Sequence, residues 1–127
     1  MCIRDSGFTC AYDKEGGFRG MEACLAQKAE PFRTKRLVQF RLEDTERLLY
    51  HDEPILRNGE VVGRTTGGMF SYVEGKALAM AYLNNEKGVT KDWIESGTFE
   101  IEVATELIPA TASLRSFYDP KNERVKV

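Results

Sequence analysis

Residues 51–83 read HDEPILRNGEVVGRTTGGMFSYVEGKALAMAYL, and this stretch decides the fold of the chain. Two apolar runs meet in it at Asn58-Gly59, the residue types that most readily adopt the two positive φ angles of a type I′ turn. A two-residue loop also fixes the strand register, so each residue of one strand has a defined partner on the other. The expected cross-strand pairs are Arg57 with Glu60, Leu56 with Val61 and Ile55 with Val62. The stretch therefore predicts a β-hairpin.

Further strands are predicted on both sides of this hairpin. Alternation of residue character is typical of half-buried strands, and it occurs at 38–42, 77–83 and 99–103. The run 107–114 contains Pro109, which cannot donate a hydrogen bond to a sheet, so we expect an edge or bulged strand there. Five or six short strands with turns between them favour a mainly β fold, a small antiparallel barrel or sandwich.

The connections between these strands are less regular. Residues 43–49 fit either a helical turn or a loop, and residues 90–96 around Trp93 fit a short helix or turn. The Thr/Gly corner at 65–68 is interpreted as a β-corner in which glycine permits positive φ and close backbone approach. The end of the chain, 117–127, is expected to be an extended tail lying on the barrel.

The N-terminal part has a different pattern. We expect a short strand at 7–12 and a helix from Met21 to about Ala29. Pro31 ends this helix, because the residue before a proline is pushed out of the α region. We place a basic linker at 31–34, which separates residues 7–30 from a C-terminal domain at 35–127.

The first six residues, MCIRDS, have no apolar core and are not a signal peptide. They resemble the translated adapter remnant that opens some gene predictions from sequence assemblies. We treat residues 1–6 as a non-native leader and exclude them from the fold, so the native chain is expected to begin mid-gene. The alternative is that these residues are a genuine short N-terminal arm.

Composition narrows the functional classes. With 127 residues, 42% hydrophobic and 30% charged, the chain suits one soluble globular domain. The net charge is −2 and no cluster of lysine and arginine stands unopposed, so we expect no nucleic-acid partner and no membrane surface. Three cysteines, Cys2, Cys10 and Cys24, form neither a disulfide framework nor a zinc pattern. A reducing cytoplasm fits this cysteine usage best.

No group of residues predicts catalysis or metal binding. His51 stands beside Asp52 and Glu53, but consecutive strand residues point to opposite faces and do not converge on a metal. The Thr/Gly corner lacks the Gly-Lys-Ser/Thr ending of a phosphate-binding loop. Glu100 and Glu102 share one strand face, which alternation predicts to be solvated. Taken alone, the residues predict a non-catalytic β domain with no metal ligands.

Four segments in order resemble a known family: GGFRGMEACLAQK at 16–28, KRLVQFRLED at 35–44, the stretch at 51–83, and FEIEVATELIPATASLRSFYDP at 99–120. They are similar to the C-terminal part of the aminomethyltransferase (glycine cleavage T-protein) family, with the dimethylglycine and sarcosine dehydrogenase branch the nearest in likeness. The resemblance implies a Greek-key or jelly-roll-like C-terminal barrel, preceded by a strand-helix remnant of the folate-binding module at 7–30.

The same resemblance implies what the longer protein does. An upstream FAD domain would oxidise a small N-methyl amine, and the folate-binding module would capture the one-carbon unit on tetrahydrofolate. The family's catalytic residues would lie upstream, so none is assigned here. Arg115, Phe117 and Tyr118 are the candidate cofactor-binding residues on the side of the folate tail. Arg115 would be a cation for the glutamate and the two rings would pack beside the aminobenzoate.

Three hypotheses follow. In the first, the chain is a fragment of a folate-dependent dehydrogenase or aminomethyltransferase, its partners are the upstream domains, and it is inactive alone. In the second, it is a stand-alone barrel that binds or interacts without catalysis. In the third, it is a complete small enzyme built around His51. The first hypothesis also predicts an exposed apolar face on residues 7–12 and the following helix, which would have lost their packing partners.

Overall fold

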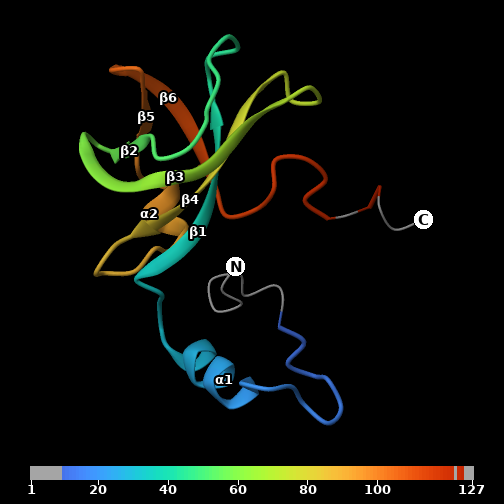
Figure 1. The fold of residues 1–127 in the computed structure, drawn as a ribbon. Coiled ribbons are helices and arrows are strands. Elements are labelled where there is room, and N and C mark those ends of the chain that lie inside the picture. Colours follow the sequence, from blue (N-terminus) through green and yellow to red (C-terminus); the bar gives the residue numbers. More distant parts are fainter. Residues whose placement is uncertain (1–9, 122, 125–127) are drawn as a thin grey trace.

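A computed structural model of the chain describes residues 10–121, 123 and 124. Within these residues the chain forms two helices and six strands (Figure 1). They are α1 (Met21–Ala29), β1 (Lys35–Leu42), β2 (Pro54–Arg57), β3 (Glu60–Ser71), β4 (Lys76–Asn84), α2 (Lys91–Glu95), β5 (Phe99–Val103) and β6 (Glu106–Ser113). Neither of these helices is long and apolar enough to cross a membrane.

The six strands close into an antiparallel barrel in the order β1-β4-β3-β2-β5-β6. Strands β2, β3 and β4 follow one another as a meander, and β1 joins the far side of β4. This arrangement is a Greek key, in which three consecutive strands are completed by a fourth over a longer connection. The expected mainly β antiparallel barrel of five or six strands is confirmed, and it has six.

The hairpin forms as predicted near its turn and departs from the prediction farther away. Asn58 and Gly59 have φ angles of 51° and 84°, and Arg57 and Leu56 pair with Glu60 and Val61. The predicted partner of Ile55 is wrong. A register shift between Leu56 and Ile55 marks a β-bulge, so Ile55 pairs with Gly63 and not with Val62. A bulge adds one residue to one strand, and no sequence pattern here marks its position.

The Thr/Gly corner lies inside β3. A second register shift falls between Thr65, which pairs with Ala81, and Gly67, which pairs with Met80. Gly67 and Gly68 do not have positive φ, so that part of the prediction is wrong. The close approach is confirmed at Gly68, where a Cβ would lie 2.4 Å from the Cβ of Leu49.

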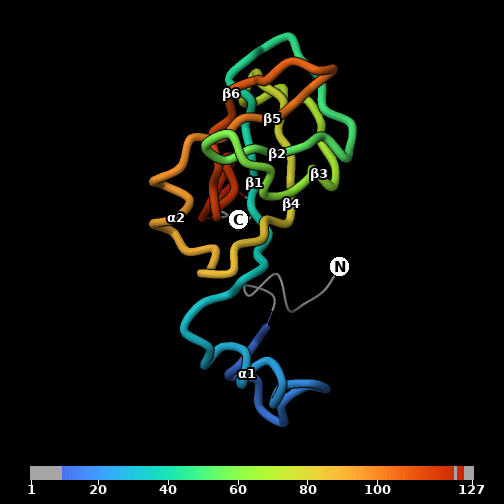
Figure 2. Tube along the Cα trace, turned by 90° about the vertical axis from the view of Figure 1, so that its left-hand side faces the viewer, coloured from blue at the N-terminus to red at the C-terminus, as the bar shows by residue number. Residues whose placement is uncertain are grey.

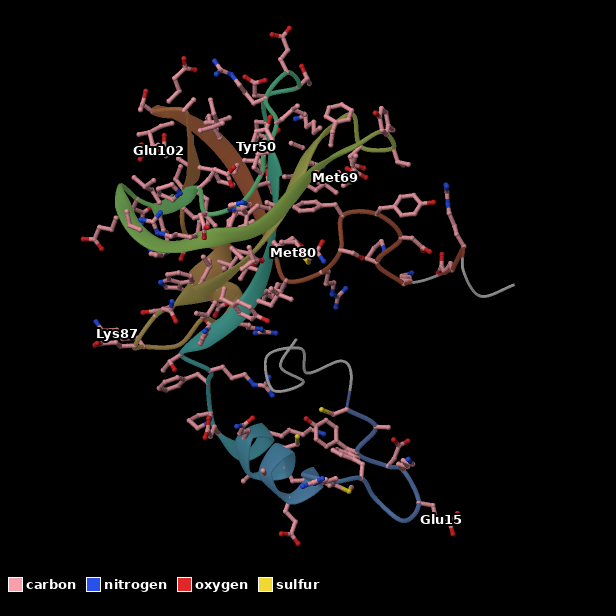
Figure 3. All side chains as sticks on the ribbon, in the orientation of Figure 1. Glu15, Tyr50, Met69, Met80, Lys87 and Glu102 are labelled. Carbon is pink, nitrogen blue, oxygen red and sulfur yellow. The ribbon has the colours of Figure 1, made fainter. Side chains whose placement is uncertain are left out.

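The core follows the alternation read from the sequence. Buried hydrophobic residues come from every strand except β3, and loop residues and α2 complete the set: Val38, Phe40, Leu42, Leu49, Ile55, Ala77, Ala79, Ala81, Leu83, Val89, Ile94, Phe99, Ile101 and Ile108. Strand β3 contributes the buried Thr65 and the partly buried Val62. The rings of Phe40 and Phe99 meet edge to face at 5.6 Å between centroids. Each large side chain buried in this way contributes about 1.5–3 kcal/mol. On the outer face, Met69 and Met80 of neighbouring strands are exposed (Figure 3).

The connections resolve the alternatives left by the sequence. Thr90 caps α2, its side chain accepting the backbone N–H of Trp93 at 3.1 Å, so 90–96 is a short helix. Residues 43–49 form a loop, held by Asp44, which accepts the N–H groups of Glu46 and Arg47. A helical turn is therefore not formed there.

Strand β6 is neither an edge nor bulged, because the barrel closes between β1 and β5. Pro109 stands one residue beyond the last pair between β6 and β1, Ala110 with Leu42. The missing N–H of proline therefore falls where the ladder with β1 has already ended. Its carbonyl still accepts the N–H of Glu43 at 2.9 Å. The edge prediction failed because chain order does not reveal closure.

Helix α1 spans the predicted residues and lies apart from the barrel, beyond the end that carries α2 (Figures 1 and 2). Of the strand predicted at 7–12, residues 7–9 lie outside the described part, and residues 10–12 form no strand, with a turn beginning at Tyr12. No residue of α1 is buried, and Leu25 is 42% exposed. The described part of the C-terminal tail turns rather than running along the barrel, which it contacts through Phe117.

Candidate functional site

A cavity of about 540 Å³ opens at the α2 end of the barrel, between β1, α2 and the end of β6. Its lining is Arg36, Lys91, Ile94, Glu95, Ala112, Ser113, Leu114 and Arg115. Three of these lining residues are cations and one is an acid, while Ile94, Ala112 and Leu114 are aliphatic and Ser113 carries a hydroxyl. The cavity therefore combines apolar surface with a local excess of positive charge.

Arg36 reaches this cavity because of its position in β1. Alternation along the strand points Val38, Phe40 and Leu42 into the barrel, and Arg36 continues the same face at the open end. Its Nη1 donates to the carbonyl of Val89 at 3.5 Å. Burial first, and the neighbouring Arg33 second, hold the pKa of Arg36 below its usual value. A guanidinium remains charged at neutral pH even so.

Lys91 and Glu95 lie one turn apart on α2 and form an ion pair at 3.5 Å. Both side chains are more than half exposed, so the pair contributes well under about 1 kcal/mol to stability. The carboxylate of Glu95 offsets the charge of Lys91. The described lining holds no second acid to offset the charges of Arg36 and Arg115. A smaller hollow of about 350 Å³ shares Arg36 and Lys91 and adds Arg33 of the linker.

The structure separates the three residues predicted as a site. Arg115 lines the cavity, where Ser113 holds the chain in a turn by accepting the N–H of Arg115 at 3.0 Å and donating to its carbonyl at 2.8 Å. Phe117 packs on the guanidinium of Arg41, 5.1 Å from the ring centre. Tyr118 contacts Arg124, which lies 5.5 Å over the ring and donates to the hydroxyl at 3.3 Å.

Two cationic residues of the cavity, Arg36 and Lys91, were not predicted from the sequence. Extending the alternation of 38–42 by two residues would have placed Arg36 on the inward face, so a usable signal was present. Lys91 gave no such signal, because its place depends on how α2 covers the barrel. The grouping of the three cations could not be predicted either, because they lie far apart in the sequence, in three separate segments.

A second polar cluster lies on the outer face of the barrel and joins β1, β4 and β6. The carboxylate of Glu43 accepts hydrogen bonds from Lys76 and Thr111, and Arg41 lies 3.8 Å away. The hydrogen bond from Lys76 is the main reason that the pKa of Glu43 is lowered, and that from Thr111 is the next. This cluster ties neighbouring strands together, and its Glu43 and Thr111 also line a separate cavity of about 440 Å³ beside β6.

His51 lies at the surface beside Asp52. Its side chain is 73% exposed, and its Nδ1 lies 3.0 Å from the carboxylate of Asp52. Among residues 10–121, 123 and 124, no three histidine, cysteine, aspartate or glutamate side chains gather closely enough to hold a metal ion. Glu53 is engaged by the buried Thr65, which donates to it.

Comparison with known proteins adds to this geometry. Residues 35–119 match the family described as the glycine cleavage T-protein C-terminal barrel domain. The chain is 39% identical over 120 residues to the 4-methylaminobutanoate oxidase (formaldehyde-forming) of Paenarthrobacter nicotinovorans, covering 94% of this chain and 14% of that protein. It is 36% identical over 121 residues to human mitochondrial sarcosine dehydrogenase, covering 94% and 13%. It is 31% identical over 111 residues to the aminomethyltransferase of Rippkaea orientalis, covering 87% and 28%.

Proposed function

Because the chain belongs to the glycine cleavage T-protein C-terminal barrel family, we propose that it serves as the terminal barrel of a longer folate-dependent enzyme. That enzyme would move a one-carbon unit from an N-methyl or aminomethyl amine to tetrahydrofolate. The chain spans 13–28% of the length of the relatives compared above, so the activity of the whole enzyme is part of the proposal. Sarcosine and 4-methylaminobutanoate, named in two relatives, are both N-methyl amines.

The observation that supports this function is the cationic cavity around Arg115. The glutamate tail of a folate carries two carboxylates, and Arg36 and Arg115 can each donate charge-assisted hydrogen bonds to such groups. A cavity of about 540 Å³ lies within the range of small-molecule sites. Ile94 and Leu114 offer apolar contact beside the charges. The tail would be bound and oriented here while the reacting end of the folate extends beyond the barrel.

We assign the binding of the pterin ring and of the flavin to other parts of the longer protein. Glu95, the one acid of the described lining, is paired with Lys91 and is poorly placed to hold a pterin ring. The chain has no Gly-x-Gly-x-x-Gly motif for FAD, so the flavin that would accept electrons from the amine belongs to upstream domains of the same polypeptide. Phe117 and Tyr118 remain a prediction for the aminobenzoate side. A cytoplasmic location is likewise part of the proposal.

Titration of the full chain with 5-formyltetrahydrofolate, an oxidation-resistant reduced folate, tests the cavity by calorimetry. Loss of one charge-assisted contact of about 1.4 kcal/mol weakens binding about tenfold, so Arg115→Ala should raise Kd by that factor. Lys121→Ala removes the same charge from an exposed tail position and should leave Kd unchanged. Equal Kd values for the parent chain and Arg115→Ala would refute the assignment.

The second hypothesis, a stand-alone barrel that binds a partner without catalysis, predicts a different gene context. Sequence upstream of residue 7 should continue in frame into a folate-binding module under the first hypothesis. A stop codon there would favour the second. The third hypothesis predicts turnover by the isolated chain that is lost in His51→Ala, whereas the proposed function predicts no turnover by either.

A further inference from the structure

The predicted linker between α1 and β1 is hydrogen-bonded to the turn that follows β4 (Figure 1). The N–H of Asn85 donates to the carbonyl of Thr34 at 2.8 Å. The N–H of Val89 donates to the carbonyl of Arg33, also at 2.8 Å. These two bonds continue the antiparallel pairing of β1 with β4 past the start of β1 and the end of β4. Residues 32–35 therefore lie along the end of the barrel and are attached to it.

The turn at 85–88 has its own internal support. The N–H of Gly88 donates to the carbonyl of Asn85 at 2.9 Å, and the side-chain amide of Asn85 donates back to the carbonyl of Gly88 at 2.6 Å. Gly88 has a φ angle of 97°, which residues with a side chain rarely adopt. The backbone alone therefore favours glycine at this position.

Phe32 packs directly on this glycine. A Cβ at Gly88 would lie 2.7 Å from the Cβ of Phe32 and 2.8 Å from its Cγ and Cδ2. The ring and the turn can approach this closely only because position 88 lacks a Cβ. Gly88 is buried, whereas Phe32 is 44% exposed. The phenyl ring thus covers the turn and leaves its other side to solvent.

From these contacts we propose that residues 32–35 are a latch, which is closed when Phe32 packs on Gly88 and open when the ring leaves. Closure fixes the direction in which residues 10–30 extend from the barrel. Helix α1 buries none of its residues, so burial in a core does not hold it in place. Pro31, between the helix and the latch, has a fixed φ and adds stiffness to the connection. Closure of the latch does not depend on what the cavity binds.

The latch also positions Arg36, which follows it directly. Val89 holds the latch through its N–H, and its carbonyl accepts a hydrogen bond from Nη1 of Arg36 at 3.5 Å. Arg36 lines both the cavity of about 540 Å³ and the hollow of about 350 Å³, and Phe32 lines the hollow. Opening would release Val89 from the linker and remove one wall of the hollow, so the guanidinium would lose its fixed place. This consequence for an anion site rests on the proposed function, whereas the latch itself does not.

Hydrogen exchange in the full chain, followed by NMR, tests whether the latch exists. The amides of Asn85 and Val89 donate to the linker, so they exchange when it opens. Phe32→Ala should speed their exchange about tenfold, the equivalent of about 1.4 kcal/mol, because the ring that covers the turn is lost. The amide of Asn58, which donates to the carbonyl of Thr98 after α2, is the internal reference and should exchange at an unchanged rate. Phe32→Tyr keeps the ring and should keep the parent rates.

A second pair of variants acts through the glycine. Gly88→Ala places a Cβ against Phe32 and should also speed the exchange of the Val89 amide. Gly75→Ala is the matched control, since Gly75 has a φ of 66° and its Cβ would meet nothing within 4 Å, so exchange at Val89 should not change. In a Phe32→Ala background, Gly88→Ala should add less than it does alone, because both changes remove the same contact. Equal exchange rates in Gly88→Ala and Gly75→Ala would contradict the latch.

Backbone nitrogen relaxation tests the fixed direction of the N-terminal segment. With the latch closed, the amides of α1 and of the barrel should report one common tumbling time, and in Phe32→Ala those of α1 should report a shorter one. Unchanged exchange at Val89 in Phe32→Ala, or tumbling of α1 that is independent of the barrel in the parent chain, would overturn the proposal. So would equal tumbling of α1 in the two proteins. Neither measurement involves a folate, so failure of the latch is distinguishable from failure of the folate titration.

Discussion

Replacement of Arg57 by alanine should loosen the contact between the hairpin and α2, the helix that forms one wall of the cavity. Arg57 ends β2, and its Nε and Nη2 donate to the carbonyl of Trp93 at 3.2 and 3.0 Å. Nη2 also donates to the hydroxyl of Ser96 at 3.1 Å, and the guanidinium lies 4.6 Å over the Trp93 ring. One side chain therefore connects β2 to the helix in two ways.

The magnitude follows from these contacts. The paired bonds to one carbonyl contribute about 1 kcal/mol and the contact over the indole about 0.5–1 kcal/mol, with the solvent-exposed serine bond adding little. Arg57→Ala should thus lower the free energy of unfolding by about 2 kcal/mol. With a urea m-value of about 2 kcal/mol/M for a domain of this size, the midpoint should fall by about 1 M.

Urea unfolding followed by Trp93 fluorescence measures this change directly, because Trp93 is the one tryptophan of the chain. Arg57→Lys is the matched control: it keeps the charge and the aliphatic stem but lacks the planar fork, so it should recover less than half of the loss. A midpoint for Arg57→Ala within about 0.2 M of the parent would refute the reasoning, since it would mean that these contacts contribute less than about 0.5 kcal/mol.

Two further predictions concern β3 and the outer polar cluster. Gly63→Ala would place a Cβ 2.7 Å from the Tyr82 carbonyl oxygen and should destabilise the fold by about 1–3 kcal/mol. The control is Gly67→Ala on the same strand, whose Cβ would meet nothing within 4 Å and should be near neutral. Similar urea midpoints for the two variants would contradict this prediction. The folded pKa of Glu43 is lowered by Lys76 from its ordinary 4.5, so its stabilisation is present above that value and is lost as pH falls through the lower folded pKa. Because Glu43 is 40% exposed, the loss should stay under about 1 kcal/mol, and Glu43→Gln should reduce the drop in midpoint between neutral pH and about pH 3. An unchanged drop would count against the cluster.

Local chemistry predicted much of this fold. The Asn58-Gly59 turn, the alternation at 99–103 and the helix ended by Pro31 each appear in the structure, because each depends on residues close together in the chain. The shifted partner of Ile55 and the internal place of Pro109 were not predictable in this way. Bulges and barrel closure arise from contacts among all six strands, so no single window of sequence contains them.

The candidate site shows the same division. Arg115 was predicted from a family resemblance, and it does line a cavity, but Phe117 and Tyr118 beside it in sequence contact Arg41 and Arg124 instead. The turn held by Ser113 sends Arg115 toward the barrel end while the next residues take other directions. The site is assembled from β1, α2 and the end of β6, and these segments come together only when the barrel closes. The sequence could therefore indicate single residues of the site but not their grouping.

The central claim, that the cationic cavity receives the carboxylates of a folate tail, is tested most directly by a pair of ligands. Folic acid and pteroic acid share the pterin and aminobenzoate and differ by the glutamate. Calorimetry with the full chain should give folic acid a Kd lower by about tenfold or more, as expected for about 1.4 kcal/mol of charge-assisted contact. The difference should shrink in Arg115→Ala. Equal affinities of the parent chain for the two ligands would contradict the claim.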